Sequence, residues 1–350
     1  MARLDTLSET LKLDRVLKDS VVVITGAGRG IGWATVQALS SRGAKVVFGD
    51  ILEPQSSLPT NCTFLKADVT KYNDILALFK HALWHHGHVD HAISNAGIAE
   101  RPGWFDPSLG IAGVESPPDM LTEEVDLRAV LWFSHIAVQY LSHGTTSPHD
   151  SQDRSLTLVS SKTGFKETVG AAVYQASKHG VLGIMRSLRN YLPSKFKPNI
   201  RINTVCPGGT DTPMVAGIKE HFSRQGGPQW NSAESLAQVI VAVTAAGKGS
   251  QAVLYDDNSI MRRRQNRGGM DWDDDEREAR GMSGRSWYVV EGQAWDIEEG
   301  LDRTEDLWMG KEASDLCQKA QAAIGVKTDW NAEGGAKGDE QKLDVLEVVV

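Results

Sequence analysis

Two residues that a proton-transfer reaction could use, Tyr174 and Lys178, lie four positions apart near the middle of the chain. If this segment is helical, their side chains face the same way, about one turn from each other. A free phenol has a pKa of about 10 and is a poor base at neutral pH, but a neighbouring ammonium favours the phenolate. Ser161, which precedes them, could bind an oxygen on which charge develops. The residue types therefore suit proton transfer to or from an oxygen.

The pattern Tyr-x-x-x-Lys is common by chance and usually lies on a helix surface, so its weight depends on the elements around it. Residues 155–160 read as a strand that delivers Ser161 to the carboxyl edge of a sheet. Residues 119–142 read as a long helix with an apolar stripe wide enough for a core and for an oligomer interface.

The stretch 21–50 has the order strand, glycine turn, helix, strand. Residues 21–24 are apolar without a polar face, which is typical of a strand buried on both sides. In the turn, Gly26 allows the chain to leave the strand, Gly30 lets a pyrophosphate approach the backbone, and Gly32 lets the helix lie close to the sheet. The backbone N–H groups of the helix start would then face the phosphates of a dinucleotide.

Two charged residues bear on which dinucleotide binds. Asp50 ends the strand that follows, where a carboxylate can accept hydrogen bonds from both adenosine ribose hydroxyls and repels a 2′-phosphate. Arg29 lies inside the glycine turn, where a cation could pair with a 2′-phosphate. Either residue could instead be a solvated surface charge. Because a strand-end carboxylate is the usual ribose reader, Asp50 favours NAD over NADP.

Two further predicted strands, 62–66 and 89–94, also end in polar residues. Asp68 could contact the adenine amine. An N-cap role for the helix that begins near Tyr72 would explain an aspartate at this position nearly as well. Asn95, followed by Ala and Gly, leaves room for a cofactor and could tie neighbouring strands through its amide. The loop 98–120 is long, and its aromatic residues either wall a substrate pocket or cover the sheet edge.

The composition limits the possible partners and compartments. A net charge of −8 argues against nucleic acid or an anionic membrane as partner. Three widely spaced cysteines are typical of a reduced, cytoplasmic protein, and the sequence contains no apolar run of membrane-spanning length. His81 and His85 lie one turn apart, but no third ligand accompanies them, so we expect no metal site.

Together these motifs resemble the short-chain dehydrogenase/reductase family. The matching pieces, in family order over residues 18–245, are Thr25 to Gly32, Asp68-Val69, Asn95-Ala96-Gly97, Ser161, Tyr174 with Lys178, and Pro207 to Thr212. The resemblance implies an α/β fold with a Rossmann-type doubly wound parallel sheet. It also implies hydride transfer between NAD or NADP and a small-molecule alcohol or carbonyl substrate.

The resemblance also assigns roles to residues. Tyr174 becomes the proton donor or acceptor, Lys178 holds the nicotinamide ribose and lowers the tyrosine pKa, and Ser161 orients the carbonyl. The expected cofactor contacts are Gly26, Arg29, Ile31, Asp50, Asp68, Asn95, Tyr174, Lys178, Val205, Thr210 and Thr212.

One position departs from the family pattern. Where members usually have an asparagine that holds a water of the proton relay, this chain has Asp126. An aspartate accepts hydrogen bonds but cannot donate as an amide does, and it adds a negative charge. A catalytically weak dinucleotide-binding protein with a regulatory or partner role is therefore the alternative function.

The chain exceeds the roughly 200 to 250 residues that one α/β domain usually needs. We expect a single nucleotide-binding domain with an insertion, and we expect a homodimer or homotetramer. Residues 286–290 read as the last strand, and the segment around it resembles the tails of family members from fungal secondary-metabolite pathways, which points to a tailoring enzyme. The expected segments are an N-terminal extension (1–17), the Rossmann domain with the catalytic site (18–254), a charged insertion (255–284), the last strand with a packing segment (285–325), and a polar tail (326–350).

Overall fold

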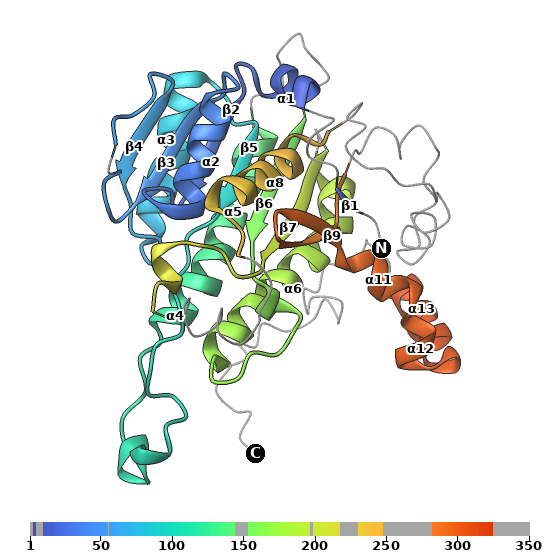
Figure 1. The fold of residues 1–350 in the computed structure, drawn as a ribbon. Helices are drawn as coiled ribbons and strands as arrows, with labels where there is room; N and C mark the ends of the chain where they lie inside the picture. Colours follow the sequence, from blue (N-terminus) through green and yellow to red (C-terminus); the bar gives the residue numbers. More distant parts are fainter. Residues whose placement is uncertain are drawn as a thin grey trace, which may run out of the picture.

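One nine-stranded sheet organises the chain in the computed structural model, with helices on both of its faces (Figure 1). The structure describes residues 3–4, 10–54, 56–143, 153–196, 199–217, 230–247 and 282–324. The strands are β1 (Arg3–Leu4), β2 (Val21–Thr25), β3 (Lys45–Asp50), β4 (Cys62–Lys66), β5 (His91–Ser94), β6 (Arg154–Val159), β7 (Ile200–Pro207), β8 (Ser286–Val290) and β9 (Gln293–Asp296).

The order across the sheet is β1-β9-β8-β7-β6-β5-β2-β3-β4. From β4 to β8 every neighbouring pair is parallel, and only β9 and β1 run antiparallel to their neighbours. The strand order reverses beside β2, so the carboxyl ends of β2 and β5 flank the position where doubly wound sheets bind ligands. This topology confirms the predicted Rossmann-type fold.

The helices are α1 (Thr10–Leu17), α2 (Gly30–Ser40), α3 (Tyr72–His86), α4 (Leu121–Glu123), α5 (Ala129–Ser142), α6 (Ala172–Lys195), α8 (Ala233–Ala245), α11 (Ile297–Arg303), α12 (Glu305–Met309) and α13 (Lys311–Ile324). Short 3-10 turns are η1 (Pro107–Leu109), η2 (Ala112–Val114), η4 (Lys162–Gly164) and η5 (Pro213–Val215). A π-helical stretch, η3 (Glu124–Arg128), lies between α4 and α5. The predicted long helix over 119–142 is therefore interrupted by a π turn.

The core has two parts, one on each face of the sheet. Val22 and Ile24 of β2 pack with residues of α2 and α8, whereas Val21 and Val23 pack with residues of α3, α5 and α6. All four side chains are fully buried. Because side chains alternate along a strand, a run with no polar position is what a strand covered on both faces requires.

The sequence predicted residues 286–290 as the last strand of the sheet, but the sheet continues beyond this strand. Glu291 and Gly292 both adopt left-handed backbone conformations, with φ of 52° and 70°, and such a pair matches the tight turn of a β-hairpin. The chain therefore turns back as β9, and β1 from the N-terminal segment pairs with β9. Arg285 bonds the buried Asp296 across this edge.

The loop 98–120 forms an arm that projects from the body of the molecule (Figure 1). Its base is closed by Arg101, whose Nε lies 3.0 Å from a carboxylate oxygen of Asp119, and by Trp104, whose indole N–H donates to the Asp119 carbonyl. Phe105 is 78% exposed. This residue is directed into solvent in the described structure rather than covering the sheet.

Several sequence predictions fall outside the described residues. They are residues 255–281 of the charged insertion and the polar tail 326–350. Residues 282–284, predicted as the end of the insertion, are described, and Met282 packs in the core. Within the described ranges, no helix is both long enough and apolar enough to cross a membrane.

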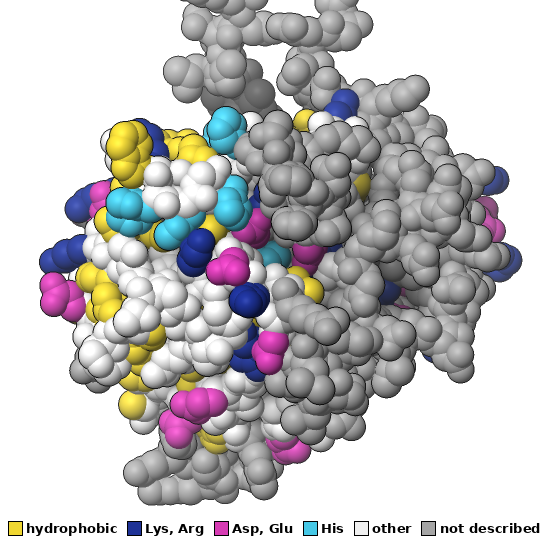
Figure 2. All heavy atoms as spheres, turned by 90° about the horizontal axis from the view of Figure 1, so that it is seen from above, with side chains coloured by type: hydrophobic (Ala, Val, Ile, Leu, Met, Phe, Trp, Pro, Cys, Tyr) yellow, Lys and Arg dark blue, Asp and Glu magenta, His cyan; other side chains and the backbone are white. Residues whose placement is uncertain are grey.

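Histidine side chains gather beside apolar ones on the face shown in Figure 2. The His81 and His85 rings lie 4.1 Å apart between centroids on α3. In the part of the chain that the structure describes, no group of three or more histidine, cysteine or acidic residues could hold a metal ion.

His91, by contrast, is buried at the amino end of β5, at the opposite end of the sheet from the glycine turn. Its Nδ1 lies 2.9 Å from the Ser155 hydroxyl, and the charged groups around it are Asp90, Asp153, Arg154 and Arg201. Burial lowers the pKa of His91, and the two acidic neighbours do not offset that effect. The folded protein therefore binds this proton less tightly than the unfolded chain does.

This burial predicts a loss of stability in mild acid. The His91 contribution is fully present above the ordinary pKa of 6.5 and declines as the pH falls below it, by up to about 1.4 kcal/mol per pH unit. Urea unfolding at about pH 7.5 and about pH 5.5 measures the slope, which we expect to be smaller in His91→Gln. His135→Gln, at an exposed position, is the control. Equal slopes in the His91 variant and the parent would contradict the assignment.

Candidate active site

The glycine turn after β2 leaves the start of α2 open. Arg29 is the N-cap residue of α2, and its side chain makes no capping hydrogen bond. Gly26 has a φ of 66°, and a Cβ there would collide with the backbone of Ala96. The backbone of the turn is thus packed directly against the carboxyl end of β5, with free amides of α2 beside it.

Polar side chains join this turn to the neighbouring segments. The Asn95 amide donates to the carbonyl oxygens of Gly26 at 2.7 Å and of Thr25 at 3.3 Å, which confirms the predicted tie between strands. On the other side, a Cβ built at Gly30 would lie 3.3 Å from the Thr212 methyl group. Residues about 180 positions apart in the sequence therefore meet at the glycine turn.

Asp50 lies against the same turn. One of its carboxylate oxygens accepts the Gly28 N–H and the other accepts the Leu52 N–H, both at 2.9 Å. These bonds fix the carboxylate at the end of β3, beside the dinucleotide turn. The Arg29 side chain, in contrast, is exposed.

Asp68 organises the turn that precedes α3. Its Oδ1 accepts hydrogen bonds from both the N–H and the hydroxyl of Thr70, and Lys71 lies 3.6 Å from its other oxygen. Burial acts to raise the pKa of Asp68, but these bonds and Lys71 outweigh it and lower the pKa. Lys71, not Asp68, is the N-cap residue of α3, so the capping alternative is wrong.

Strand β7 supports the site from within the sheet. Val205 is fully buried in the core, and its carbonyl accepts the N–H of Ser160. Thr210 is buried after the strand, and the amide of buried Asn231 donates to its hydroxyl oxygen at 3.4 Å and to the Val289 carbonyl. Asn231 was not identified from the sequence, since nothing local indicates its long-range role. Ile31 is partly buried and packs against the core from α2.

The serine segment is joined directly to the helix that carries the tyrosine. The Ser160 hydroxyl donates to the carbonyl of Lys178 at 2.9 Å. Ser161 is the N-cap residue of η4, and its hydroxyl oxygen accepts the Thr163 N–H at 3.2 Å. On α6 the Lys178 ammonium lies 5.4 Å from the centroid of the Tyr174 ring. The structure thus places Ser161, Tyr174 and Lys178 on two segments that are bonded to each other.

Lys178 is buried together with Asp126. The ammonium lies 3.7 Å from Asp126 Oδ1, which also accepts the Ile98 N–H at 3.0 Å. Asp126 Oδ2 is buried and has no hydrogen-bond partner among the described residues. The π turn η3 directs Asp126 into this position, and π turns recur at functional sites.

Burial and mutual attraction together shift the pKa values of Asp126 and Lys178. Burial raises the pKa of Asp126, and the Lys178 ammonium opposes this rise without cancelling it. Burial alone would lower the pKa of Lys178, but attraction by Asp126 and Tyr174 outweighs it and raises that pKa. Lys178 therefore carries its positive charge at neutral pH.

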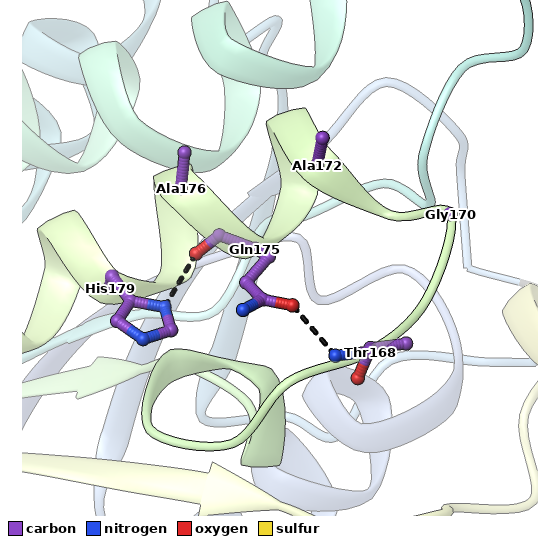
Figure 3. A pocket seen from close by; sticks show the side chains of 6 residues that line it. All are labelled: Thr168, Gly170, Ala172, Gln175, Ala176 and His179. Carbon is purple, nitrogen blue, oxygen red and sulfur yellow. Dashed lines mark hydrogen bonds between the residues drawn. The ribbon is translucent and has the colours of Figure 1, made fainter. Parts of the chain in front are cut away.

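The start of α6 is held by a residue that sequence analysis did not identify. Glu100, from the arm, accepts the N–H groups of Tyr174 at 2.6 Å and of Val173 at 3.2 Å. On the outer side of the same turn, Gln175 accepts the Thr168 N–H at 2.7 Å (Figure 3). Gln175 and His179 also line an open pocket of about 450 Å³ on this outer side.

The residues at the carboxyl edge fit a nicotinamide dinucleotide. The open amides at the start of α2 suit a pyrophosphate, and Asp50 stands where the adenosine ribose would follow. Near the other end of the edge, Gly97 leaves a space next to the charged pair: a Cβ there would lie 2.9 Å from Asp126 Oδ1 and 3.3 Å from the Lys178 ammonium.

Comparison with known proteins agrees with this geometry. Residues 20–222 match the family model described as short chain dehydrogenase. The short-chain dehydrogenase/reductase ascJ of Acremonium egyptiacum is 39% identical over 197 residues, which cover 56% of this chain and 65% of that relative. The short-chain dehydrogenase/reductase prx4 of Penicillium roqueforti is 28% identical over 307 residues, 87% of this chain and 85% of the relative.

A bacterial relative is named for its substrate. The cis-4-hydroxycyclohexanecarboxylate dehydrogenase of Sinomonas cyclohexanicum is 31% identical over 208 residues, 57% of this chain and 77% of that protein. Among solved structures, ligand-free aldohexose dehydrogenase of Thermoplasma acidophilum superposes with a TM-score of 0.52 at 24% identity, covering 65% of this chain and 88% of that one. This structural likeness supports the fold.

The space at Gly97 predicts an asymmetric response to two glycine substitutions. Gly97→Ala would push a methyl group against the Asp126 carboxylate, beside the Lys178 ammonium, and we expect it to destabilise the protein by about 1 to 3 kcal/mol. Gly183→Ala, at an exposed position of α6 with no atom within 4 Å of the added carbon, should stabilise by about 0.5 to 1 kcal/mol. Urea unfolding measures both changes. An unchanged unfolding midpoint in Gly97→Ala would contradict the packing described here.

Proposed function

The chain belongs to the short-chain dehydrogenase/reductase family, an enzyme family, and from this premise we propose that it catalyses hydride transfer between a nicotinamide dinucleotide and a secondary alcohol or ketone. The observation that carries the proposal is the buried Lys178 ammonium beside Tyr174, on a helix that is hydrogen-bonded to the serine segment. A buried cation next to a phenol is an arrangement suited to moving a proton to or from oxygen.

In the proposed reduction, the protein supplies the proton and holds the oxygen. The Tyr174 hydroxyl donates its proton to the carbonyl oxygen, and the Lys178 ammonium stabilises the phenolate that remains. The Ser161 hydroxyl oxygen accepts a backbone N–H, which leaves its own hydrogen available to donate to the same substrate oxygen. The bound dinucleotide supplies the hydride in this direction and accepts it in the reverse one.

The proposed cofactor is NAD. Asp50 is fixed by two backbone N–H groups, so its carboxylate cannot turn away from the ribose without losing those bonds. A 2′-phosphate would meet this negative charge, and only the exposed Arg29 offers compensation within the turn.

The proposed substrate is a small molecule with a secondary hydroxyl or a ketone, in a tailoring step of secondary metabolism. Support comes from the fungal relatives and from the relative named for a ring-bearing hydroxy acid. We propose a homodimer or homotetramer because Leu131 on α5 is 49% exposed. A cytoplasmic location is proposed because Cys62, Cys206 and Cys317 are all free.

Asp126 favours a second function, that of a dinucleotide-binding protein with little or no catalysis. Its carboxylate neutralises part of the Lys178 charge that would otherwise stabilise the Tyr174 phenolate. In this alternative the cofactor site is intact, and the protein senses the cofactor or binds a partner.

Titration with NADH and with NADPH, followed by turnover on a panel of ketones, tests the proposed function. We expect NADH to bind at least about tenfold more tightly than NADPH, because Asp50 repels the 2′-phosphate. Tyr174→Phe should lower kcat by about a hundredfold or more, because it removes the proton donor. Asp50→Asn serves as the control. It should reduce the difference in affinity between NADH and NADPH and leave proton transfer by Tyr174 unchanged. Failure to bind either dinucleotide would refute the whole assignment.

Asp126→Asn separates the two functions. The asparagine carbonyl can still accept the Ile98 N–H, while the charge facing Lys178 is removed. For an active enzyme we expect kcat to rise by less than about tenfold, which corresponds to about 1.4 kcal/mol. The measurement is steady-state turnover of parent and variant on the same ketone. Turnover present only in the variant would favour the non-catalytic alternative.

A further inference from the structure

The helix that carries Tyr174 lacks a cap of its own. Its N-cap residue, Ala171, has no side chain that can accept a hydrogen bond, and its first turn contains no acidic residue. The first amides of a helix have no partner within the helix, so an uncapped start tends to fray. Tyr174 is the third residue of α6 and lies in this weak turn.

Glu100 supplies the missing cap from outside the helix. Its two carboxylate oxygens take separate partners: Oε2 accepts the Tyr174 N–H at 2.6 Å, and Oε1 accepts the Val173 N–H at 3.2 Å. A carboxylate at this end also interacts favourably with the helix dipole. The cap comes from more than seventy residues away in sequence, so it links the helix to the segment after β5.

This link is short and is anchored at both of its ends. Two residues before Glu100, the Ile98 N–H donates to Asp126, the partner of Lys178. One residue after it, Arg101 pairs with Asp119 at the base of the arm. The stretch 98–101 therefore contacts the lysine pair, the tyrosine turn and the arm in succession.

The other side of the turn has a separate support. The Gln175 side chain accepts the Thr168 N–H, which holds the loop after η4 against α6 (Figure 3). The backbone N–H of Gln175 donates to the Ala171 carbonyl. These bonds are local to the loop and the helix. Only Glu100, among the described contacts of this turn, connects the tyrosine backbone to the strand edge at which the cofactor site lies.

We propose that Glu100 is a positioning residue that fixes Tyr174 relative to Lys178 and the substrate oxygen by capping the first turn of α6. It acts through the backbone of Tyr174 and does not itself touch the reacting atoms. The proposal rests on the proposed hydride-transfer function.

The test compares Glu100→Gln and Glu100→Ala with the parent. A glutamine keeps one acceptor oxygen and replaces the other by an N–H₂ group, which cannot accept a backbone hydrogen, whereas alanine removes both acceptors. Amide hydrogen exchange of the segment containing Val173 and Tyr174 should accelerate, by about tenfold or more in Glu100→Ala and by less in Glu100→Gln. This readout needs neither cofactor nor substrate.

Kinetic measurements then distinguish a loss of Tyr174 positioning from a loss of folded protein. We expect kcat to fall in the same order, by about tenfold or more in Glu100→Ala, while the dissociation constant for NADH stays within about twofold of the parent. The isotope effect measured with deuterated NADH should rise, because the chemical step is slowed selectively. A variant that is merely less folded would lose kcat and NADH-binding capacity together, with no change in isotope effect.

Glu115→Gln is the matched control, because it removes the same charge from an exposed position of the same arm. It should leave amide exchange, kcat and NADH binding at parental values. Unchanged exchange in Glu100→Ala, or a kcat equal to that of the parent, would overturn the proposal. If the parent turns over no ketone while exchange accelerates as expected, the proposed function fails and Glu100 is only a structural cap.

Discussion

The burial of the Lys178 ammonium is the constraint on which the arrangement of the site depends. Removing a charged amine from water costs several kcal/mol unless an opposite charge accompanies it. Asp126 supplies that charge, and it reaches Lys178 because the helix before α5 widens into a π turn. The absence of a side chain at Gly97 leaves space beside the pair. The π turn and Gly97 thus both help to accommodate the buried Lys178 ammonium beside its counter-charge.

The dinucleotide edge is organised by a different requirement, the close approach of backbones. The turn at Gly26 lies so near β5 that a side chain would collide with Ala96, and the Asn95 amide bonds across the gap. The Asp50 carboxylate accepts the Gly28 N–H on the other side of the same turn. Each contact uses backbone groups of a short sequence motif, so these features could be predicted from local residue types.

The sequence predicted what depends on local pattern. The parallel strands β2 and β3 lie where runs of apolar residues indicated, because strands covered on both faces need such runs. The hairpin to β9 was missed, since Glu291 is an unusual residue for a left-handed turn. Glu100 was missed for a stronger reason: its partners lie over seventy positions away, and no periodicity or spacing encodes such a contact. The π turn within the predicted 119–142 helix was also missed, because apolar periodicity indicates that a segment is helical but does not locate a single π turn inside it.

The cost of the buried pair also bears on what the site is for. Replacing a buried ion pair by apolar residues of similar volume is often neutral or stabilising, so folding alone does not call for Lys178 and Asp126. Asp126 Oδ2 lacks a partner among the described residues, which adds to that cost. The glycine turn, Asn95 and Asp50, which lie together at the end of the edge expected to hold the pyrophosphate and the adenosine, are on other segments. The ammonium is instead held beside a phenol on a helix whose first turn is secured by Glu100. A buried charge that is costly for folding and lies beside a phenol supports the proposed proton transfer.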